Sequence, residues 1–207
     1  MLRIAHVWRR GGIRLKKALL GVGGVLTLLL FLVVPATSAS ADYFGTNCPD
    51  GNTPCRADDA NMDFCTPHAW SSTWGNPFTD AMANLDLQTV MYDTYQPVCG
   101  PQTDIGGYLN SGDGIVLNSS TRGRYACTKP LYGWGWGKCD QASIYVNTYL
   151  LTSYELRRKT FCHEVGHAIG LYHGNDAGNG CMVTTSGATF SFYTSHQVND
   201  HINPEYD

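Results

Sequence analysis

The stretch C-H-E-V-G-H-A-I-G-L-Y-H, which runs from Cys162 to His173, holds three histidines at a spacing that one zinc ion can use. On an α-helix, His163 and His167 lie one turn apart and project from the same face. A helix that simply continued would carry His173 nearly two turns further along the axis. Gly170 resolves this, because glycine takes left-handed backbone angles without a side-chain clash. We therefore expect the helix to end at Gly170 and the chain to turn His173 back to the same metal.

A carboxylate beside the first histidine completes the pattern H-E-x-x-H-x-x-G-x-x-H. Glu164 is expected to act as a general base toward an attacking water rather than as a metal ligand. The five fixed positions of this pattern arise by chance in a chain of this length on the order of once in 10⁵ sequences. After residue 41, three histidines lie outside the pattern, and we interpret them as ordinary polar or partly buried residues: His68, His196 and His201.

The helix that carries the motif has a predicted start and a predicted core face. Thr152 and Glu155 fit a capping box at its first turn. Apolar residues then recur at three- and four-residue intervals, and three basic residues are expected to point elsewhere. The apolar face comprises Leu151, Tyr154, Phe161, Cys162, Val165, Ala168 and Ile169, and the basic residues are Arg157, Arg158 and Lys159. Packing on one side gives the metal ligands a rigid support.

Residues 1–41 are typical of a secretory signal peptide. Six basic residues precede an apolar run over 18–34, and small residues at 39–41 form a cleavage site. A retained membrane anchor is the alternative, because the apolar run approaches the length that spans a bilayer. Cleavage after Ala41 predicts an extracellular chain of residues 42–207, which has the size of one ordinary domain.

The charge balance changes when the leader is removed. Of the 14 Lys and Arg residues, the leader takes six, so eight remain against 17 acidic residues and the formal charge moves from −3 to −9. Such a charge argues against nucleic acid or an anionic membrane surface as a partner. It does not identify a substrate.

All eight cysteines lie after residue 41, and an even number in an exported chain predicts four disulfides. A cysteine metal site is the competing interpretation, but the sequence has no C-x-x-C. A bridge between Cys127 and Cys139 would close the loop between them. The four N-terminal cysteines are Cys48, Cys55, Cys65 and Cys99, and their three possible pairings stay open.

The rest of the chain predicts an α+β domain without internal repeats. A first helix is expected over 78–89, after Asn76-Pro77. Strands are expected over 89–95, 103–106, 114–118 and 143–147, and a further short one within the disulfide-tied segment 42–66. A short C-terminal helix over 195–202 would be capped by Thr194 or Ser195. Together these elements predict a mixed sheet of about four to five strands, stapled by disulfides.

Two loops have open interpretations. Segment 121–140 holds Trp134 and Trp136 among glycines, and it forms either a wall of a substrate cleft or a surface loop over a small apolar cluster. Aspartates of the N-terminal segment could bind calcium, but they lack the order of a calcium loop, so a solvated acidic loop is the favoured interpretation. They are Asp50, Asp58, Asp59 and Asp63.

The extended motif resembles that of the metzincins, the zinc endopeptidases that include the matrixins, the astacins and snapalysin. The resemblance implies Zn²⁺ held by His163, His167 and His173, with Glu164 as general base. It also implies a Met-turn beneath the metal, for which Met182 is the candidate because no other methionine follows the motif. The implied fold is metzincin-like, a twisted mixed sheet with a first helix, an active-site helix and a short C-terminal helix.

Cys162 and Cys181 each precede one of these site residues, so the resemblance also leads us to expect a Cys162–Cys181 disulfide. The chain departs from the family in three ways. Snapalysin-like enzymes are expected to use aspartate where this chain has His173. No tyrosine directly follows the candidate Met-turn, which leaves Tyr193 as the candidate hydrogen-bond donor to the transition state. No propeptide or cysteine switch is visible.

The function that the resemblance implies is that of a secreted zinc endopeptidase, acting as a monomer on protein or peptide substrates. Two alternatives remain open. One is a secreted zinc-binding or adhesion module without turnover on the same fold, and the other is a metal-dependent amidase that acts on cell-wall peptide. Glu164 favours an enzyme, because a purely structural zinc site would not need a carboxylate there.

Overall fold

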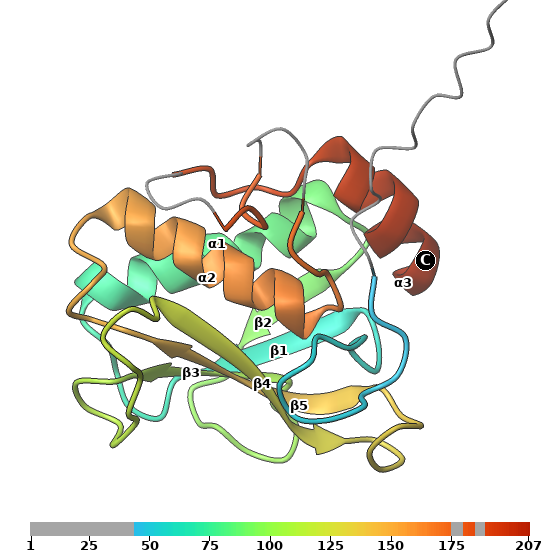
Figure 1. The fold of residues 1–207 in the computed structure, drawn as a ribbon, viewed down its shortest axis with the longest axis horizontal. Helices are drawn as coiled ribbons and strands as arrows, with labels where there is room; N and C mark the ends of the chain where they lie inside the picture. Colours follow the sequence, from blue (N-terminus) through green and yellow to red (C-terminus); the bar gives the residue numbers. More distant parts are fainter. Residues whose placement is uncertain (1–43, 175–179, 185–188) are drawn as a thin grey trace, which may run out of the picture. The chain divides into compact units, whose positions relative to one another are not determined.

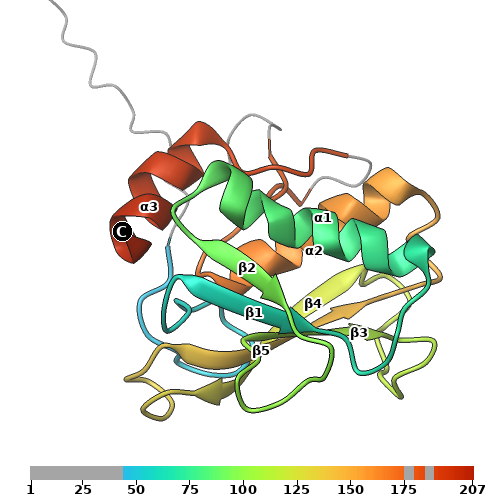
Figure 2. The same ribbon diagram turned by 180° about the vertical axis from the view of Figure 1, so that it is seen from behind.

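The computed structural model describes residues 44–174, 180–184 and 189–207. The predicted signal peptide and its cleavage site lie outside these residues and stay predictions. The described residues form an α+β fold in which helices lie on one face of a five-stranded mixed sheet (Figures 1 and 2). No helix in this part of the chain is long and apolar enough to cross a membrane.

The sheet has the strand order β2-β1-β3-β5-β4. Four strands run parallel, and β4 pairs antiparallel with β5 at one edge. The bounds are Asn61–Cys65 for β1, Tyr92–Tyr95 for β2, Ile105–Leu109 for β3, Gly123–Pro130 for β4 and Cys139–Val146 for β5. The outer side of β4 thus has no neighbouring strand among the described elements.

Two long helices cover the same face of this sheet and lie side by side (Figures 1 and 2). They are α1 (Ser72–Gln88) and α2 (Tyr154–Ala168). An aromatic cluster joins the layers, because the Phe78 ring centroid lies 4.9 Å from that of Phe161 and 5.3 Å from that of Phe64 on β1. The core therefore lies between the sheet and the helix that carries the zinc motif.

The predicted limits of the first helix were wrong, because α1 begins at Ser72 and contains Pro77. Pro77 is the sixth residue of α1, so it removes the backbone hydrogen bond to Thr73 and crowds that carbonyl. The additional first turn is retained because Trp74 packs against the core. The C-terminal helical segment is also longer than predicted, since the π-helical turn η1 (Gln197–Ile202) continues directly into α3 (Asn203–Tyr206). The predicted cap is present, with Thr194 Oγ1 accepting from the Gln197 N–H at 3.2 Å.

Two strand predictions were also wrong. Residues 114–118 form no strand, and Val116 is 89% exposed there, so its side chain has no core to pack against. The segment predicted as a loop contains β4 instead. β4 was missed because an edge strand buries few side chains, here Tyr125 and Cys127, and its other residues are polar or small.

The N-cap of helix α2 lies one residue after the predicted one. Ser153, not Thr152, is the N-cap, and its hydroxyl accepts the Leu156 N–H at 3.2 Å. The predicted core face needs two corrections, since Tyr154 is 39% exposed and Lys159 is buried. Lys159 is buried because the segment after the motif covers it, and its Nζ donates to Val183 O there.

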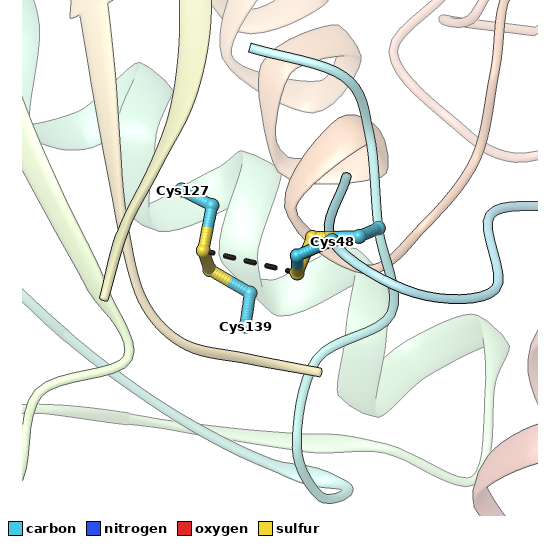
Figure 3. A group of neighbouring side chains, drawn as sticks. Cys48, Cys127 and Cys139 are labelled. Atoms are coloured by element: carbon cyan, nitrogen blue, oxygen red, sulfur yellow. Dashed lines mark hydrogen bonds between the residues drawn. A yellow bond between two sulfur atoms is a disulfide. The ribbon is translucent and has the colours of Figure 1, made fainter. Parts of the chain in front are cut away.

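Four disulfides join the eight cysteines, and none is left free. The Cys162–Cys181 and Cys127–Cys139 bridges expected from the sequence are present. The four N-terminal cysteines, whose pairing the sequence left open, form the bridges Cys48–Cys55 and Cys65–Cys99. The cysteines are therefore bridged rather than free to bind metal, although two disulfides lie close together, with Cys48 Sγ 4.0 Å from Cys127 Sγ (Figure 3).

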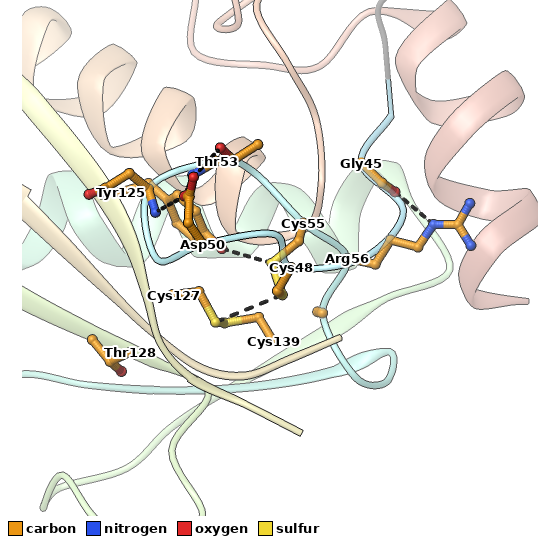
Figure 4. Close-up of a disulfide and its surroundings, with 12 residues drawn as sticks. Gly45, Cys48, Asp50, Thr53, Cys55, Arg56, Tyr125, Cys127, Thr128 and Cys139 are labelled. Atoms are coloured by element: carbon orange, nitrogen blue, oxygen red, sulfur yellow. Dashed lines mark hydrogen bonds between the residues drawn. A yellow bond between two sulfur atoms is a disulfide. The ribbon is translucent and has the colours of Figure 1, made fainter. Parts of the chain in front are cut away.

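The N-terminal segment is held along the hairpin of β4 and β5 (Figure 4). The Cys127 N–H donates to Gly51 O at 2.8 Å, and the Cys139 N–H donates to Arg56 O at 2.7 Å. The Asp50 carboxylate accepts the N–H groups of the two residues that close its own turn, at 2.7 Å each. This segment occupies the far end of the outer edge of β4, and it leaves the end near Gly123 uncovered.

Candidate metal centre and cleft

The three histidines of the motif converge on one point. α2 presents His163 and His167 from one face, and His173 follows the end of the helix. One ring nitrogen of each lies within 4.8 Å of the other two, and the ring centroids are 4.6, 4.9 and 5.1 Å apart. Three imidazoles at this spacing fit a tetrahedral Zn²⁺ with its fourth position open.

The turn after α2 has the geometry that the sequence predicted. Gly170 has φ +103°, in the left-handed region. Its N–H donates to His167 O at 3.1 Å, and the Leu171 N–H donates to Gly166 O at 2.8 Å. These two bonds make a Schellman motif, which satisfies the last carbonyls of the helix and reverses the chain. The reversal brings His173 beside the two helical histidines.

Backbone carbonyls orient the two helical imidazoles. His163 Nδ1 lies 2.7 Å from Cys181 O, and His167 Nδ1 lies 2.7 Å from Leu171 O. A carbonyl can only accept, so each Nδ1 carries the proton and each Nε2 keeps a free lone pair for a metal. Burial lowers the pKa of all three histidines, and that of His167 falls to about 4. The imidazoles are thus neutral, the form that binds metal.

Met182 is fully buried beneath this centre. A Cβ added at Gly166, between the two helical ligands, would overlap Met182 Sδ and lie 3.0 Å from Met182 Cε. The segment around Met182 is tied to α2 by the Cys162–Cys181 bridge. It is held again by Lys159, whose Nζ donates to Val183 O at 2.7 Å. Met182 therefore packs against α2 at Gly166, between the two helical histidines.

The Glu164 carboxyl is almost completely buried in the wall of the same site. Burial raises its pKa to about 8, while the Lys159 charge and the Tyr125 N–H act in the opposite direction. A Cβ at Gly123 would lie 2.5 Å from Glu164 Oε1, so only glycine lets β4 approach this closely. The carboxyl is consequently fixed between α2 and the edge strand.

Two adjoining clefts meet at these residues. One has a volume of about 590 Å³ and the other of about 280 Å³, and both are lined by Gly123, His163, Glu164 and His173. The larger extends past Lys159, and the smaller extends toward the N-terminal segment at Pro54 and Asn52. The histidines and the carboxylate thus lie at the middle of a groove beside β4.

Sequence reasoning missed two residues of this groove. Lys159 was expected to point away from it, although its position four residues before His163 puts both on one helix face. Gly123 gave no local signal, because its role depends on the distance between β4 and α2. Helical spacing could have found the lysine, and nothing short of the strand pairing could have found the glycine.

Several predicted site residues lie elsewhere. Tyr193 is only 2% exposed and its hydroxyl donates to Cys162 O at 3.3 Å, so it cannot serve as a donor in the cleft. Trp134 and Trp136 line neither cleft and are 47% and 83% exposed at the β4–β5 turn. This favours the surface-loop interpretation. The loop is held there by hydrogen bonds between Cys48 and the backbone of Gly135 and Gly137.

The other histidines and the aspartates have different partners. His68 pairs with Asp113, His196 pairs with Asp200, and His201 stacks on Phe44. The aspartates considered for calcium belong to no described group of three or more ligand-type side chains near one point. Instead, three of them accept hydrogen bonds from neighbouring residues: Asp50, Asp59 and Asp63.

The chain matches no model of a known protein family and no curated protein sequence.

Proposed function

We propose that the chain is a secreted zinc-dependent endopeptidase with a metzincin-like fold. One observation carries the proposal: three neutral imidazoles, two of them with oriented Nε2 atoms, converge beside a buried carboxyl in the wall of one cleft. A structural zinc site is closed by four protein ligands, whereas a catalytic one has three and an open position. The described residues offer three ligands and a cleft. Met182 and the disulfide beside it support the same proposal.

The chain's own residues have separate roles in hydrolysis. A bound zinc ion supplies Lewis-acid polarisation of a carbonyl and acidification of water. Glu164 accepts the proton of the attacking water and then gives it to the leaving amine, so one carboxylate serves as base and acid. Gly123 and the Tyr125 N–H hold this carboxylate in place. Cys181 O and Leu171 O hold the ligand rings.

The edge strand supports a peptide as substrate. The Arg122 carbonyl accepts the Asn147 N–H, so position 122 faces β5, and the alternation of an antiparallel strand turns Gly123 outward. The outward N–H of Cys127 follows the same alternation and binds the N-terminal segment. An extended peptide can therefore add to β4 beside Gly123 through main-chain hydrogen bonds. This would place its backbone over the histidines.

The test compares two glutamates of α2 in the purified mature chain. Glu164→Gln keeps the shape of the side chain and removes the base, so we expect zinc content to stay at one ion per chain while hydrolysis of a mixed peptide library falls about 10²- to 10⁴-fold. Glu155→Gln is the matched control, because that residue is exposed at the helix start. Retained hydrolysis in Glu164→Gln would refute the assigned base.

The same library separates the alternatives. Peptide cleavage that a zinc chelator abolishes supports the endopeptidase. Zinc binding without cleavage of any library member supports a binding module. Cleavage confined to cell-wall peptides supports an amidase.

A further inference from the structure

The larger cleft carries positive charge beside the candidate metal centre. Lys159 and Arg122 both line it, and Glu164 is the only acid among its lining residues. Neither cation forms an ion pair with any described residue, and the Arg122 side chain has no described hydrogen-bond partner. Only eight Lys and Arg residues follow residue 41. Among the described residues, two cations and one acid line this cleft, which gives it a net positive charge in a chain segment with few basic residues.

Lys159 is built into the cleft rather than loosely placed at its rim. Its side chain is buried, and one Nζ–H donates to Val183 O at 2.7 Å. An ammonium has three donors, so the others are available to a ligand. Lys159 precedes His163 by four residues, which is one turn and about 6 Å along the helix. If a substrate carbonyl is held at the histidines, the side chain of the adjacent substrate residue can reach Lys159 across this distance.

We propose that this cleft binds a carboxylate that the substrate carries on the residue next to the cleaved bond. Lys159 supplies a buried, fixed ammonium, and Arg122, which lines the same cleft, supplies a guanidinium. Glu164 is the one acid beside these two cations in the lining of the cleft, so a ligand carboxylate supplies a second negative charge and offsets part of the cost of burying Lys159. The carboxylate belongs either to an acidic side chain or to the end of the peptide. This proposal rests on the proposed function for the position of the bond.

The kinetic test uses peptides that differ in one residue. Quenched fluorescent peptides carry Glu, Gln, Leu or Lys at each position flanking the cleaved bond, and kcat/KM is measured. Because charge-assisted hydrogen bonds are stronger than neutral ones, we expect kcat/KM to be about 10- to 100-fold higher for the Glu peptide than for the Gln peptide at one position. Lys159→Met and Arg122→Gln should each reduce that ratio, and Arg122→Glu should favour the Lys peptide. Lys129→Met, at the far end of β4, is the control and should leave the ratio unchanged.

Binding measurements separate this proposal from the proposed function. The Glu164→Gln variant is titrated with blocked peptides carrying Glu, Gln or Leu, and with a Leu peptide whose terminus is either free or amidated. Tighter binding of the Glu peptide supports a side-chain carboxylate, and tighter binding of the free terminus supports a chain end. Either result stands even if the native chain hydrolyses nothing. Hydrolysis with equal kcat/KM for Glu and Gln, and equal binding of all peptides, would overturn the proposal while leaving the endopeptidase intact.

Discussion

Replacing Gly166 by alanine has two opposed effects on the free energy of unfolding, because Gly166 packs against Met182. Replacing a helical glycine by alanine ordinarily stabilises a protein by about 1 kcal/mol, because glycine loses more backbone entropy. At Gly166, however, the new Cβ would overlap Met182 Sδ and lie 3.2 Å from Tyr193 Cε1. Both neighbours are buried, so neither side chain can move aside into solvent. Overpacking of this kind costs about 1–3 kcal/mol.

We therefore expect Gly166→Ala to lower the free energy of unfolding by about 1–2 kcal/mol, since the overlap outweighs the helix propensity. The Met182→Ala variant leaves a cavity and should itself lose about 2–5 kcal/mol. In the Met182→Ala background the overlap is gone, so adding Gly166→Ala should be neutral or stabilising. The coupling between the two substitutions should be at least about 1 kcal/mol.

The assay is urea unfolding of the disulfide-intact chain without zinc, followed by circular dichroism. Zinc affinity is measured on the same four proteins, because displacement of Met182 should also disturb the histidines above it. The reasoning would be refuted by a stabilised Gly166→Ala protein, or by additive effects in the double variant. Either result would mean that Met182 does not pack under the metal ligands.

Three further predictions concern charge, fit and metal. Burial raises the pKa of Asp104 to about 7, so the stability that the protonated carboxyl contributes is complete below about pH 4 and is lost as the pH rises through 7. Asp104→Asn should abolish this loss. Urea unfolding at pH 5 and pH 8 measures it, and we expect about 1 kcal/mol after discounting for solvent. Gly123→Ala should reduce kcat at least tenfold by displacing Glu164, with zinc content unchanged; normal turnover would contradict this. Zinc at a hundredfold excess over its Kd should stabilise the chain by about 2.7 kcal/mol in thermal unfolding, and His173→Ala should remove most of that gain.

Local spacing explains why much of the site could be predicted. His163 and His167 share a helix face because of the 3.6-residue period, and Gly170 ends the helix because of its own backbone freedom. These effects act within a few residues. The Cys162–Cys181 bridge followed from the expectation that the two sides of one metal centre must face each other.

The errors arose where a residue depends on a distant partner. β4 was read as a loop because an edge strand with one neighbour carries a weak apolar pattern. Tyr193 was proposed for the cleft from its position after Met182, yet its ring is large and apolar enough to be buried under α2. The predicted strand over 114–118 failed because alternation alone provides no partner strand.

The sequence by itself determined the candidate metal ligands, the carboxylate beside them and the turn before His173, because helix geometry places residues that are close in the chain. Only the tertiary structure decided that Met182 packs against Gly166, that Gly123 admits Glu164 beside β4, and that Lys159 lines the cleft. Those contacts depend on which strand lies at the edge of the sheet and how closely it approaches α2. Strand pairing and packing set that distance over long separations in sequence, which no local pattern records.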